Sequence, residues 1–493
     1  MFSMHNSIQQ FMDKGIKNIE KVVKSFMSNE KMDIGELVLE LNKPLQELQR
    51  DIIKETIEEI DEVYRTSGYR KDRYVIERSN DENSFTSTCG LITYNRTYFK
   101  DKKSGEFIHL ADKACGITKK MRKSDDVVAK GLEHVIDSSY RISGENATAT
   151  DDIISKQAIM KDIHRIEIPA IIPEIKEKKQ VKVLYINADE DHVSLQFNKK
   201  RGDLKVNEYG WKSNTVEPRL ACVFEGIEKE SPNSKRNKLV NKHYFSGVYK
   251  KSEDIWLEVL EYIDTVYDEE YLEKIYIMGD GAPWIKSGVQ VLGAKCRFVL
   301  DKFHLNQSIM RAVGHLGDSV SDARTAVYDG ISMEDFEIVE NVLKIAASYA
   351  ESDGKKEQIR RAKVYIRNHW EAIIRPNSDE TARMGCSAEG QVSHVLSTRL
   401  SSRPLGWSAK GASQMAKLRA YSANKGKIYD LLKYRVEKQQ RVIQEEIKKV
   451  LDQQIRKKQK TFTEVWNQST VAGSLGKVDG MYCLTKKLRG ICG

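Results

Sequence analysis

The sequence lacks the short motifs that mark several common enzyme classes. It has no GxxxxGK[ST] phosphate-binding loop, no GxGxxG after an expected strand and no HExxH zinc motif. Its seven cysteines are odd in number and scattered, with no CxxC pair. These absences argue against nucleotide hydrolysis, zinc peptidase chemistry, a structural zinc site and a disulfide framework. The cysteine usage indicates a reducing cytosol.

Long apolar runs are also absent. No stretch reaches the roughly 20 apolar residues of a membrane span, and the segment MFSMHNSIQQFMDKG lacks the compact apolar centre of a signal peptide. Hydrophobic residues make up 40% and charged residues 31% of the 493 residues, which is typical of a globular chain with two to four domains. The formal net charge of +9 permits nucleic-acid binding without requiring it.

The first third of the chain combines helical and β patterns. Leucines recur three or four apart within residues 1–66, which predicts an amphipathic helix. A small β-rich patch over 67–123 includes TCGLITYNRTYFKDK (88–102), which alternates like a hairpin. Residues 124–170 again have helical periodicity and suggest a helix-turn-helix-like DNA-binding region, although short helix pairs are common in other proteins. Prolines and a charge run then predict a linker over 168–180.

From residue 181 strands and helices alternate. An antiparallel meander is expected from VKVLYINAD (181–189), HVSLQF (192–197) and LACVFEGI (220–227). A helix, the strand KIYIMGD, a second helix and the strand CRFVLD follow, and this order predicts a mixed α/β sheet. No strand pattern occurs in 305–385, which indicates an all-helical block. A long charged helix is expected within the C-terminal region 425–493.

Two aspartates end expected strands. Asp189 closes VLYINAD, and Asp280 closes IYIMGD between two glycines. Ligands of open α/β sheets bind beyond the carboxyl ends of strands, so both side chains could meet at one edge. Two neighbouring carboxylates repel each other unless they share a divalent cation. The alternative is that each aspartate only forms a turn or caps a helix.

Further acids bear on this site. Glu389 lies in the first turn of an expected helix and could be a third metal ligand, although a glutamate there also suits the helix dipole. Asp191 competes with Asp189 for the first position because alternation puts both on one strand face. Asp189 is preferred because it lies closer to the buried run. Asp301 ends another strand, and His304 follows one helical turn later. The two residues could bind a metal together, or Asp301 could cap the helix while His304 is partly buried.

A basic segment follows the glutamate. It carries four cations suited to a phosphate backbone: Arg399, Arg403, Lys410 and Lys417. Trp407 lies in a Pro/Gly turn among them and could stack on an unpaired or flipped base. The alternative is a solvated basic helix with Trp407 in the core.

Five motifs occur along the chain: TYNRTYF, NADEDHVSLQ, GDGAPWI, DKFHL and CSAEGQVSHVLSTRLSSRPLGWS. With them the chain resembles, over most of its length, transposases of the ISLre-two group of bacterial insertion sequences, relatives of the Mutator-like superfamily. The resemblance implies an α/β, RNase H-like catalytic domain formed by 181–304 and 386–424, interrupted by the helical insertion 305–385.

The same resemblance implies the site residues. Carried over by motif, the DDE triad of catalytic and metal-binding acids is Asp189, Asp280 and Glu389. The motif C/D-x-x-H of the superfamily is matched by Asp301 and His304. Three such acids would hold two Mg²⁺ ions, with Mn²⁺ as a substitute, for in-line attack on a phosphodiester.

The activity implied is DNA transposition. The enzyme would cut the ends of its element and join the 3′-hydroxyl to target DNA. Its partners would be double-stranded DNA, in the form of terminal inverted repeats and target, and further copies of itself in a homodimer or higher oligomer. It would act in the bacterial cytosol at the nucleoid, away from membranes. Two alternatives are a decayed or domesticated DNA-binding protein without catalysis and an RNase H-like nuclease that cuts without joining.

Overall fold

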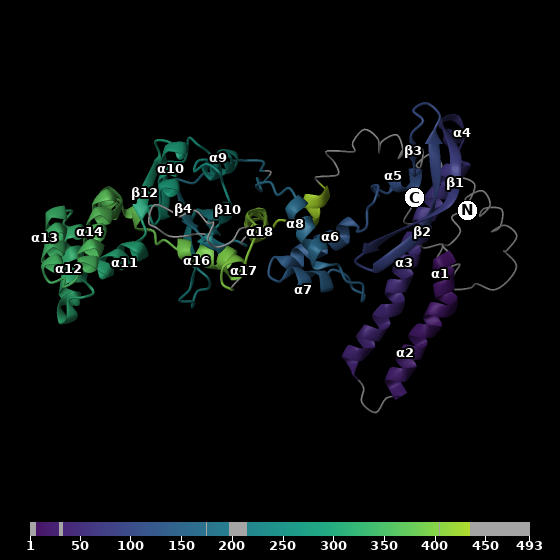
Figure 1. The fold of residues 1–493 in the computed structure, drawn as a ribbon, viewed down its shortest axis with the longest axis horizontal. Coiled ribbons are helices and arrows are strands. Elements are labelled where there is room, and N and C mark those ends of the chain that lie inside the picture. Colours follow the sequence, from purple (N-terminus) through teal and green to yellow (C-terminus); the bar gives the residue numbers. More distant parts are fainter. Residues whose placement is uncertain (1–5, 29–32, 174, 197–213, 404, 434–493) are drawn as a thin grey trace. The chain divides into compact units, whose positions relative to one another are not determined.

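The computed structural model describes residues 6–28, 33–173, 175–196, 214–403 and 405–433. It shows a chain of many helices and several strands (Figure 1). The chain divides into two compact units: Met1–Gly131, Gly144–Ile154 and Lys433–Gly493 in the first, and Leu132–Ser143 and Ser155–Leu432 in the second. No helix in the described part is long and apolar enough to cross a membrane. The helix predicted in 425–493 falls largely outside the described residues.

The first unit combines a long helix with a small antiparallel sheet. Its helices are α1 (Asn6–Gln10), η1 (Phe11–Gly15), α2 (Ile16–Ser28), α3 (Ile34–Thr66), α4 (Gly68–Arg73) and α5 (Leu110–Ala114). Its strands are β1 (Tyr74–Ser87), β2 (Gly90–Asp101) and β3 (Phe107–Ile108), in that order. The predicted helix and small sheet are confirmed. The long partner strand β1 was not predicted, because its run of charged and polar residues conceals the alternation.

Three helices occupy the region 124–170: α6 (Asp125–Val135), α7 (Tyr140–Glu145) and α8 (Lys156–Arg165). Helical structure was expected there, but as a pair of helices. Residues 146–155 contain no helix or strand and separate α7 from α8. This connection is longer than the three to four residues of a helix-turn-helix turn. DNA binding by this region therefore stays a prediction without the expected motif.

A five-stranded mixed sheet forms the centre of the second unit. Its strands are β4 (Val183–Glu190), β7 (Arg219–Phe224), β10 (His243–Gly247), β11 (Lys274–Gly279) and β12 (Cys296–Leu300). Their order across the sheet is β10-β7-β4-β11-β12. Strand β7 is antiparallel to β4 and β10, whereas β11 is parallel to β4 and β12. The predicted mixed α/β sheet is confirmed.

Alternation along β4 separates its side chains onto two faces. Leu184, Ile186 and Ala188 join a buried core cluster with residues of the helices α9 and α10. Asn187 lies on the opposite face, where its amide Nδ2 donates to Ser387 Oγ at 2.9 Å. The helices beside the sheet are α9 (Asp254–Val266), α10 (Pro283–Leu292), α16 (Ala388–Val392), η5 (Ser393–Ser397), α17 (Thr398–Leu400) and α18 (Ala409–Ala423). Residues of odd number at the end of β4 therefore face the segment that carries Glu389.

An all-helical block lies between β12 and α16 in the sequence. Its elements are α11 (Lys302–Val313), η3 (Gly317–Ser319), α12 (Val320–Ser332), α13 (Phe336–Ser348), α14 (Asp353–Asn368), α15 (Trp370–Ser378) and η4 (Glu380–Arg383). Residues 302–387, all of them described, contain no strand, as predicted. The block has its own core, which includes Ile309, Val327, Leu343 and Ile366.

One strand prediction in the second unit was wrong, and several strands were missed. The segment 192–197 supplies only β5 (Val193–Ser194), which pairs with β6 (Thr215–Val216) outside the main sheet, and residue 197 lies outside the described part. Strand β10 was missed because HYFSG is short and places a histidine and a serine in buried positions. The hairpin of β8 (Gly226–Lys229) and β9 (Asn237–Val240) was also missed, since its side chains are mostly polar.

Candidate carboxylate site at the sheet edge

Three aspartates lie at the carboxyl ends of three adjacent strands in matching register: Asp189 is the last but one residue of β4, and Asp280 and Asp301 directly follow β11 and β12. The pairing of β11 with β4 sets Met278 opposite Asn187, and two further residues along each strand lead to Asp280 and Asp189. The pairing of β11 with β12 sets Gly279 opposite Leu300, so the next pair is Asp280 and Asp301. Neighbouring strands lie about 4.8 Å apart. The three acids therefore form a row along the carboxyl edge of the parallel part of the sheet.

The two glycines beside Asp280 have different roles. A Cβ on Gly279 would lie 2.5 Å from the carbonyl oxygen of Ala188 on the neighbouring strand, so this position needs close backbone approach. Gly281 has φ +89°, a conformation that favours glycine, and a Cβ there would lie 2.3 Å from His369 Nε2. Of the two glycines, only Gly281 has the left-handed backbone conformation of a turn. The side chain of Asp280 completes it by accepting a bond from Ala282 N at 2.9 Å.

The carboxyl group of Asp189 has a raised pKa. Burial raises its pKa to about 6, and the negative charges of Asp280 and Glu190 act in the same direction. A hydrogen bond from Glu190 N and the charge of His304 oppose the rise. The carboxylate of Glu190 accepts a bond from Trp284 Nε1. The charge of Asp280 thus acts on Asp189, which places the two side chains in one electrostatic environment.

Asp301 and His304 form a bonded pair at the start of α11. Asp301 Oδ1 accepts from Phe303 N at 3.1 Å as the helix cap, and its Oδ2 lies 3.0 Å from His304 Nδ1. This contact raises the pKa of His304, and the charges of Asp280 and Asp189 add to the rise. The cap interpretation is confirmed. The charges of Asp189 and Asp280 also act on His304, so we group Asp301 and His304 with these two acids.

Helix α14 holds the Asp280 turn from the side of the helical block. The Tyr365 hydroxyl donates to the Asp280 carbonyl oxygen at 2.7 Å, and His369 Nδ1 lies 2.8 Å from the Tyr365 carbonyl oxygen. His369 Nε2 is the buried atom that a side chain at position 281 would strike. Tyr365 and His369 therefore fix the backbone that carries Asp280.

Glu389 lies near this edge but is not joined to the other acids. It is an exposed residue in the first turn of α16, a helix that packs against β4. Ser387 bonds to Asn187, and Gln391 accepts from the Tyr244 hydroxyl, so residues on both sides of Glu389 are held to the sheet. Among the described residues, no group of three or more His, Cys, Asp or Glu side chains is arranged to hold a metal ion.

Asp191 has a different environment from Asp189. It is 7% exposed, and its Oδ1 accepts from Ser401 Oγ at 2.7 Å. Its backbone nitrogen donates to the Pro218 carbonyl oxygen beyond the end of β4. The strict alternation that would put both acids on one face ends at Glu190 with the strand. This placement favours Asp189 as the acid of the site.

The structure changes the picture of Trp407 and Arg399. Trp407 is 6% exposed and its Nε1 donates to the Leu400 carbonyl oxygen at 3.0 Å. Arg399 is 9% exposed, its Nε donates to the Val135 carbonyl oxygen, and its guanidinium lies over the Trp407 ring. The core interpretation of Trp407 is therefore favoured. Neither side chain is placed to contact DNA, because both are buried: Trp407 Nε1 and Arg399 Nε bond to backbone carbonyl oxygens, and the guanidinium lies over the indole ring.

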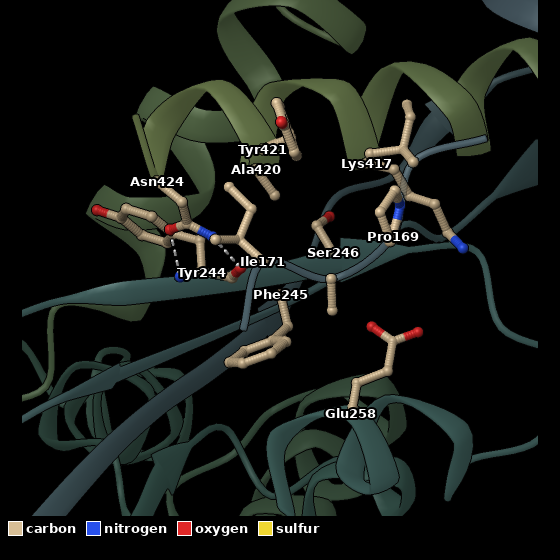
Figure 2. A pocket seen from close by; sticks show the side chains of 12 residues that line it. Pro169, Ile171, Tyr244, Phe245, Ser246, Glu258, Lys417, Ala420, Tyr421 and Asn424 are labelled. Atoms are coloured by element: carbon tan, nitrogen blue, oxygen red, sulfur yellow. Dashed lines mark hydrogen bonds between the residues drawn. The ribbon is translucent and has the colours of Figure 1, made fainter. Parts of the chain in front are cut away.

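The other three cations of the basic segment differ in exposure. Arg403 and Lys410 are exposed. Lys417 instead lines a cavity of about 30 Å³, room for about one water, together with Glu258 (Figure 2). Burial raises the pKa of Glu258, and the charge of Lys417 opposes that rise. Lys417 also lies over the ring of Tyr249. Only Arg403 and Lys410 keep the placement expected of phosphate contacts.

Comparison with known proteins gives a clear family. The sequence model of the family described as "Uncharacterised protein family (UPF0236)" matches residues 27–440. The chain belongs to the UPF0236 family. A UPF0236 protein of Caldanaerobacter subterraneus subsp. tengcongensis is 38% identical over 472 residues, covering 95% of each chain. A UPF0236 protein of Streptococcus gallolyticus, named for the vanSb 3′ region, is 25% identical over 79% of this chain and 83% of its own.

A second UPF0236 protein of the same Caldanaerobacter strain is 38% identical over 93% of this chain and 92% of its own, and its name joins eleven gene labels. Among solved structures, the Drosophila P element transposase strand transfer complex is matched at 11% identity and a TM-score of 0.22, over 66% of this chain and 82% of that one. A likeness of this size supports no conclusion about fold or activity.

Sequence reasoning missed several residues of this UPF0236 site. Tyr365 and His369 come from a helix some 85 residues after Asp280, and no local pattern links them to it. Asn187 could have been found, because alternation puts it on the same strand face as Asp189. Glu190 lies between Asp189 and Asp191 and was not among the predicted site residues.

Proposed function

We propose that this UPF0236 protein is a DDE-type DNA transposase, which cuts phosphodiester bonds at the ends of its element and joins them to target DNA with the help of divalent cations. One observation carries the proposal: Asp189 and Asp280 end adjacent parallel strands in register, and the charge of Asp280 helps to raise the pKa of Asp189. A turn or a helix cap needs no such pairing of acids.

The chemistry of the two neighbouring aspartates supports a hard cation, because carboxylate oxygens are the ligands that such ions prefer. Asp189 bears a partly buried negative charge beside a second carboxylate, and a divalent ion with oxygen ligands would relieve that repulsion. Asp189 and Asp280 would hold Mg²⁺, or Mn²⁺ in its place, and Glu389 would complete the set from α16. The bound metal would supply Lewis-acid activation of a water or a 3′-hydroxyl.

Other residues of the chain would act by holding these ligands. Tyr365 fixes the Asp280 backbone, and the Asn187–Ser387 bond ties the start of α16 to β4. The His304 ring, paired with Asp301, would lie at the same edge, where the Asp301 contact raises its pKa. The catalytic triad is thus proposed as Asp189, Asp280 and Glu389, with Asp301 and His304 as an accessory pair.

The topology supports an RNase H-like assignment for the sheet. An antiparallel meander of β4, β7 and β10 is followed by β11 and β12, which add in parallel on the other side of β4. The helical block between β12 and α16 corresponds to the insertion that the transposase resemblance implies. The eleven gene labels under one relative's name also support a mobile element, because such genes accumulate in copies.

Incubation of the purified chain with DNA tests the function. The substrate is a duplex that carries the boundary of the gene's own element, with Mg²⁺. We expect nicked and joined products from the wild type and none from Asp189→Asn, Asp280→Asn or Glu389→Gln. Asp191→Asn is the matched control and should keep substantial activity.

Two outcomes of this assay would change the proposal. Cutting without joining would favour an RNase H-like nuclease. Binding without either reaction, in wild type and variants alike, would favour a DNA-binding protein that has lost catalysis.

A further inference from the structure

A polar groove opens beside the carboxylate site, between helices α11 and α14 of the helical block. It has a volume of about 590 Å³ and begins at Asp280 and His304. Four long polar side chains line its walls: Gln307 and Arg311 on α11, and Gln358 and Arg361 on α14. All four are exposed. The groove thus leads from the proposed catalytic edge to the solvent.

The spacing of these residues makes each wall a single helical stripe. His304, Gln307 and Arg311 lie three and four residues apart on α11, so they share one face. Gln358 and Arg361 lie three apart on α14, one turn before Tyr365, which bonds to the Asp280 carbonyl oxygen. From residue 304 to residue 311 the helix rises about 10 Å. Both stripes therefore run outward from the acids. The α11 stripe ends in Arg311, whereas the α14 stripe passes Arg361 and ends in Gln358.

The chemistry of the groove suits an anionic chain. Asp280 is the single acid among the described residues that line it, and it lies at the inner end. Arg361 Nε bonds to Glu357 at 2.9 Å, which uses one of the five N–H donors of the guanidinium. Arginine and glutamine side chains are common donors to phosphate oxygens and sugars. Successive phosphates of one DNA strand follow every 3.4 Å along the axis, so a length of about 10 Å spans roughly three of them.

We propose that this groove binds the phosphate backbone of the DNA strand that enters the Asp189–Asp280 edge, with Arg311 and Arg361 as its phosphate contacts and Gln307 and Gln358 as polar supports. The proposal rests on the DNA-cleaving function proposed above and assigns a substrate path to the helical block. The path differs from the basic segment after Glu389, whose arginine Arg399 is buried.

The test compares arginines inside and outside the groove. Arg360 and Arg361 both bond to Glu357, and both are exposed, but only Arg361 lines the groove. Arg324, exposed on α12 over the Tyr328 ring, is the matched control for Arg311. The full chain and each Arg→Gln variant are titrated with a fluorescent duplex carrying the element boundary, in EDTA, at several salt concentrations.

Arg311→Gln and Arg361→Gln should each weaken binding about tenfold at 0.15 M salt. Each should also lower the slope of log K against log salt by about 0.9, the value for one lost phosphate contact. Arg324→Gln and Arg360→Gln should bind like the wild type. Wild-type affinity and salt slope in Arg311→Gln and Arg361→Gln would contradict DNA binding by the groove, even if the enzyme cuts DNA normally.

A failure of the proposed function would look different. A wild type that binds DNA through the groove but never cuts it would overturn the catalytic proposal and leave the groove standing. A wild type that binds neither the boundary duplex nor a scrambled one would overturn both. Each variant should have the melting temperature of the wild type, which shows that any loss of DNA binding is not caused by unfolding.

Discussion

The carboxylate of Asp280 acts electrostatically on that of Asp189, because the register of two parallel strands continues from the pair Met278–Asn187 to these acids. The backbone at this point is fixed from both sides. Gly279 lets β11 approach β4, and Tyr365 holds the Asp280 carbonyl from α14. A site that places like charges together costs stability, and such a cost is typical of groups kept for function.

The charge at Asp189 should be measurable as a stability effect. The pKa of Asp189 is raised from 3.8 to about 6 in the folded protein, so the folded state holds this proton more tightly than the unfolded chain does. The fold is therefore destabilised as the pH rises from 3.8 through about 6 and Asp189 loses its proton. In EDTA at pH 8, Asp189→Asn should therefore be as stable as the wild type or more stable, by up to about 3 kcal/mol. Mg²⁺ should raise the melting temperature of the wild type but not that of Asp189→Asn. Asp191→Asn, the control, should respond to Mg²⁺ like the wild type, and a destabilised Asp189→Asn would indicate a merely structural aspartate.

Gly281→Ala should destabilise the second unit. Its φ of +89° is costly for alanine, and the new Cβ would meet His369 Nε2. Strain of this kind costs about 1–3 kcal/mol before the clash is counted. Urea denaturation should show the loss, and His369→Ala in the same chain should restore part of it. Gly354→Ala, where a Cβ meets nothing within 4 Å, is the control and should be neutral or stabilising.

Tyr365→Phe removes one hydrogen bond and keeps the ring. Loss of the bond to the Asp280 carbonyl costs about 1 kcal/mol, so cleavage should slow by roughly fivefold. DNA affinity should stay unchanged, because the hydroxyl positions the acid and not the duplex. Single-turnover cleavage together with titration of the same DNA separates the two effects. Tyr328→Phe on α12 should change neither, and equal rates in all three proteins would contradict the positioning role.

His243 gives a pH dependence away from the proposed catalytic site. Burial lowers its pKa from 6.5 to about 4, so the unfolded chain takes up this proton first as the pH falls. The stability that depends on neutral His243 is present above pH 6.5 and is lost between pH 6.5 and 4, by about 3 kcal/mol. Asp189 acts with the opposite sign over part of this range. The measurement is therefore the difference between wild type and His243→Gln, and parallel stability curves would contradict it.

Substitutions of Trp407 and Arg403 should distinguish a buried residue from an exposed one in the basic segment. Trp407→Ala should cost about 3–5 kcal/mol, because it removes a large buried ring that packs under Arg399. Arg403→Ala should change stability by less than about 0.5 kcal/mol and weaken DNA binding without sequence preference. Thermal unfolding and DNA titration of both variants check this. A stable Trp407→Ala protein with impaired strand transfer would restore the base-stacking hypothesis.

The sequence allowed the central strands to be predicted because burial on both faces leaves continuous apolar runs. Strands β4 and β11 have this character, whereas β12 is an edge strand with the exposed Arg297 in it. An aspartate lies at or directly after the end of each of the three strands. Strand β10 has no such run, since its His243 and Ser246 are buried polar residues whose partners, Asn424 and the Arg219 carbonyl oxygen, are distant in sequence.

The remaining parts of the site depend on tertiary contacts that no local pattern records. Trp407 stands in a turn that would suit an exposed ring, and only its packing against Tyr140 and Arg399 shows that it is core. Tyr365 is likewise an ordinary helical residue until α14 packs beside Asp280. The sequence allowed Glu389 to be placed in the first turn of a helix. It did not indicate that Glu389 would lie apart from Asp189 and Asp280, without forming a metal-binding group with them among the described residues.

A change of ligand type at Asp280 tests the central claim most directly. Thiolate is a softer ligand than carboxylate, so Asp280→Cys should accept Mn²⁺ far better than Mg²⁺. We predict that this variant cuts boundary DNA in Mn²⁺ but not in Mg²⁺, while the wild type cuts in both and Asp280→Ala in neither. Equal cleavage by Asp280→Cys and Asp280→Ala in Mn²⁺, or full cleavage by either in Mg²⁺, would contradict a metal-binding role for Asp280.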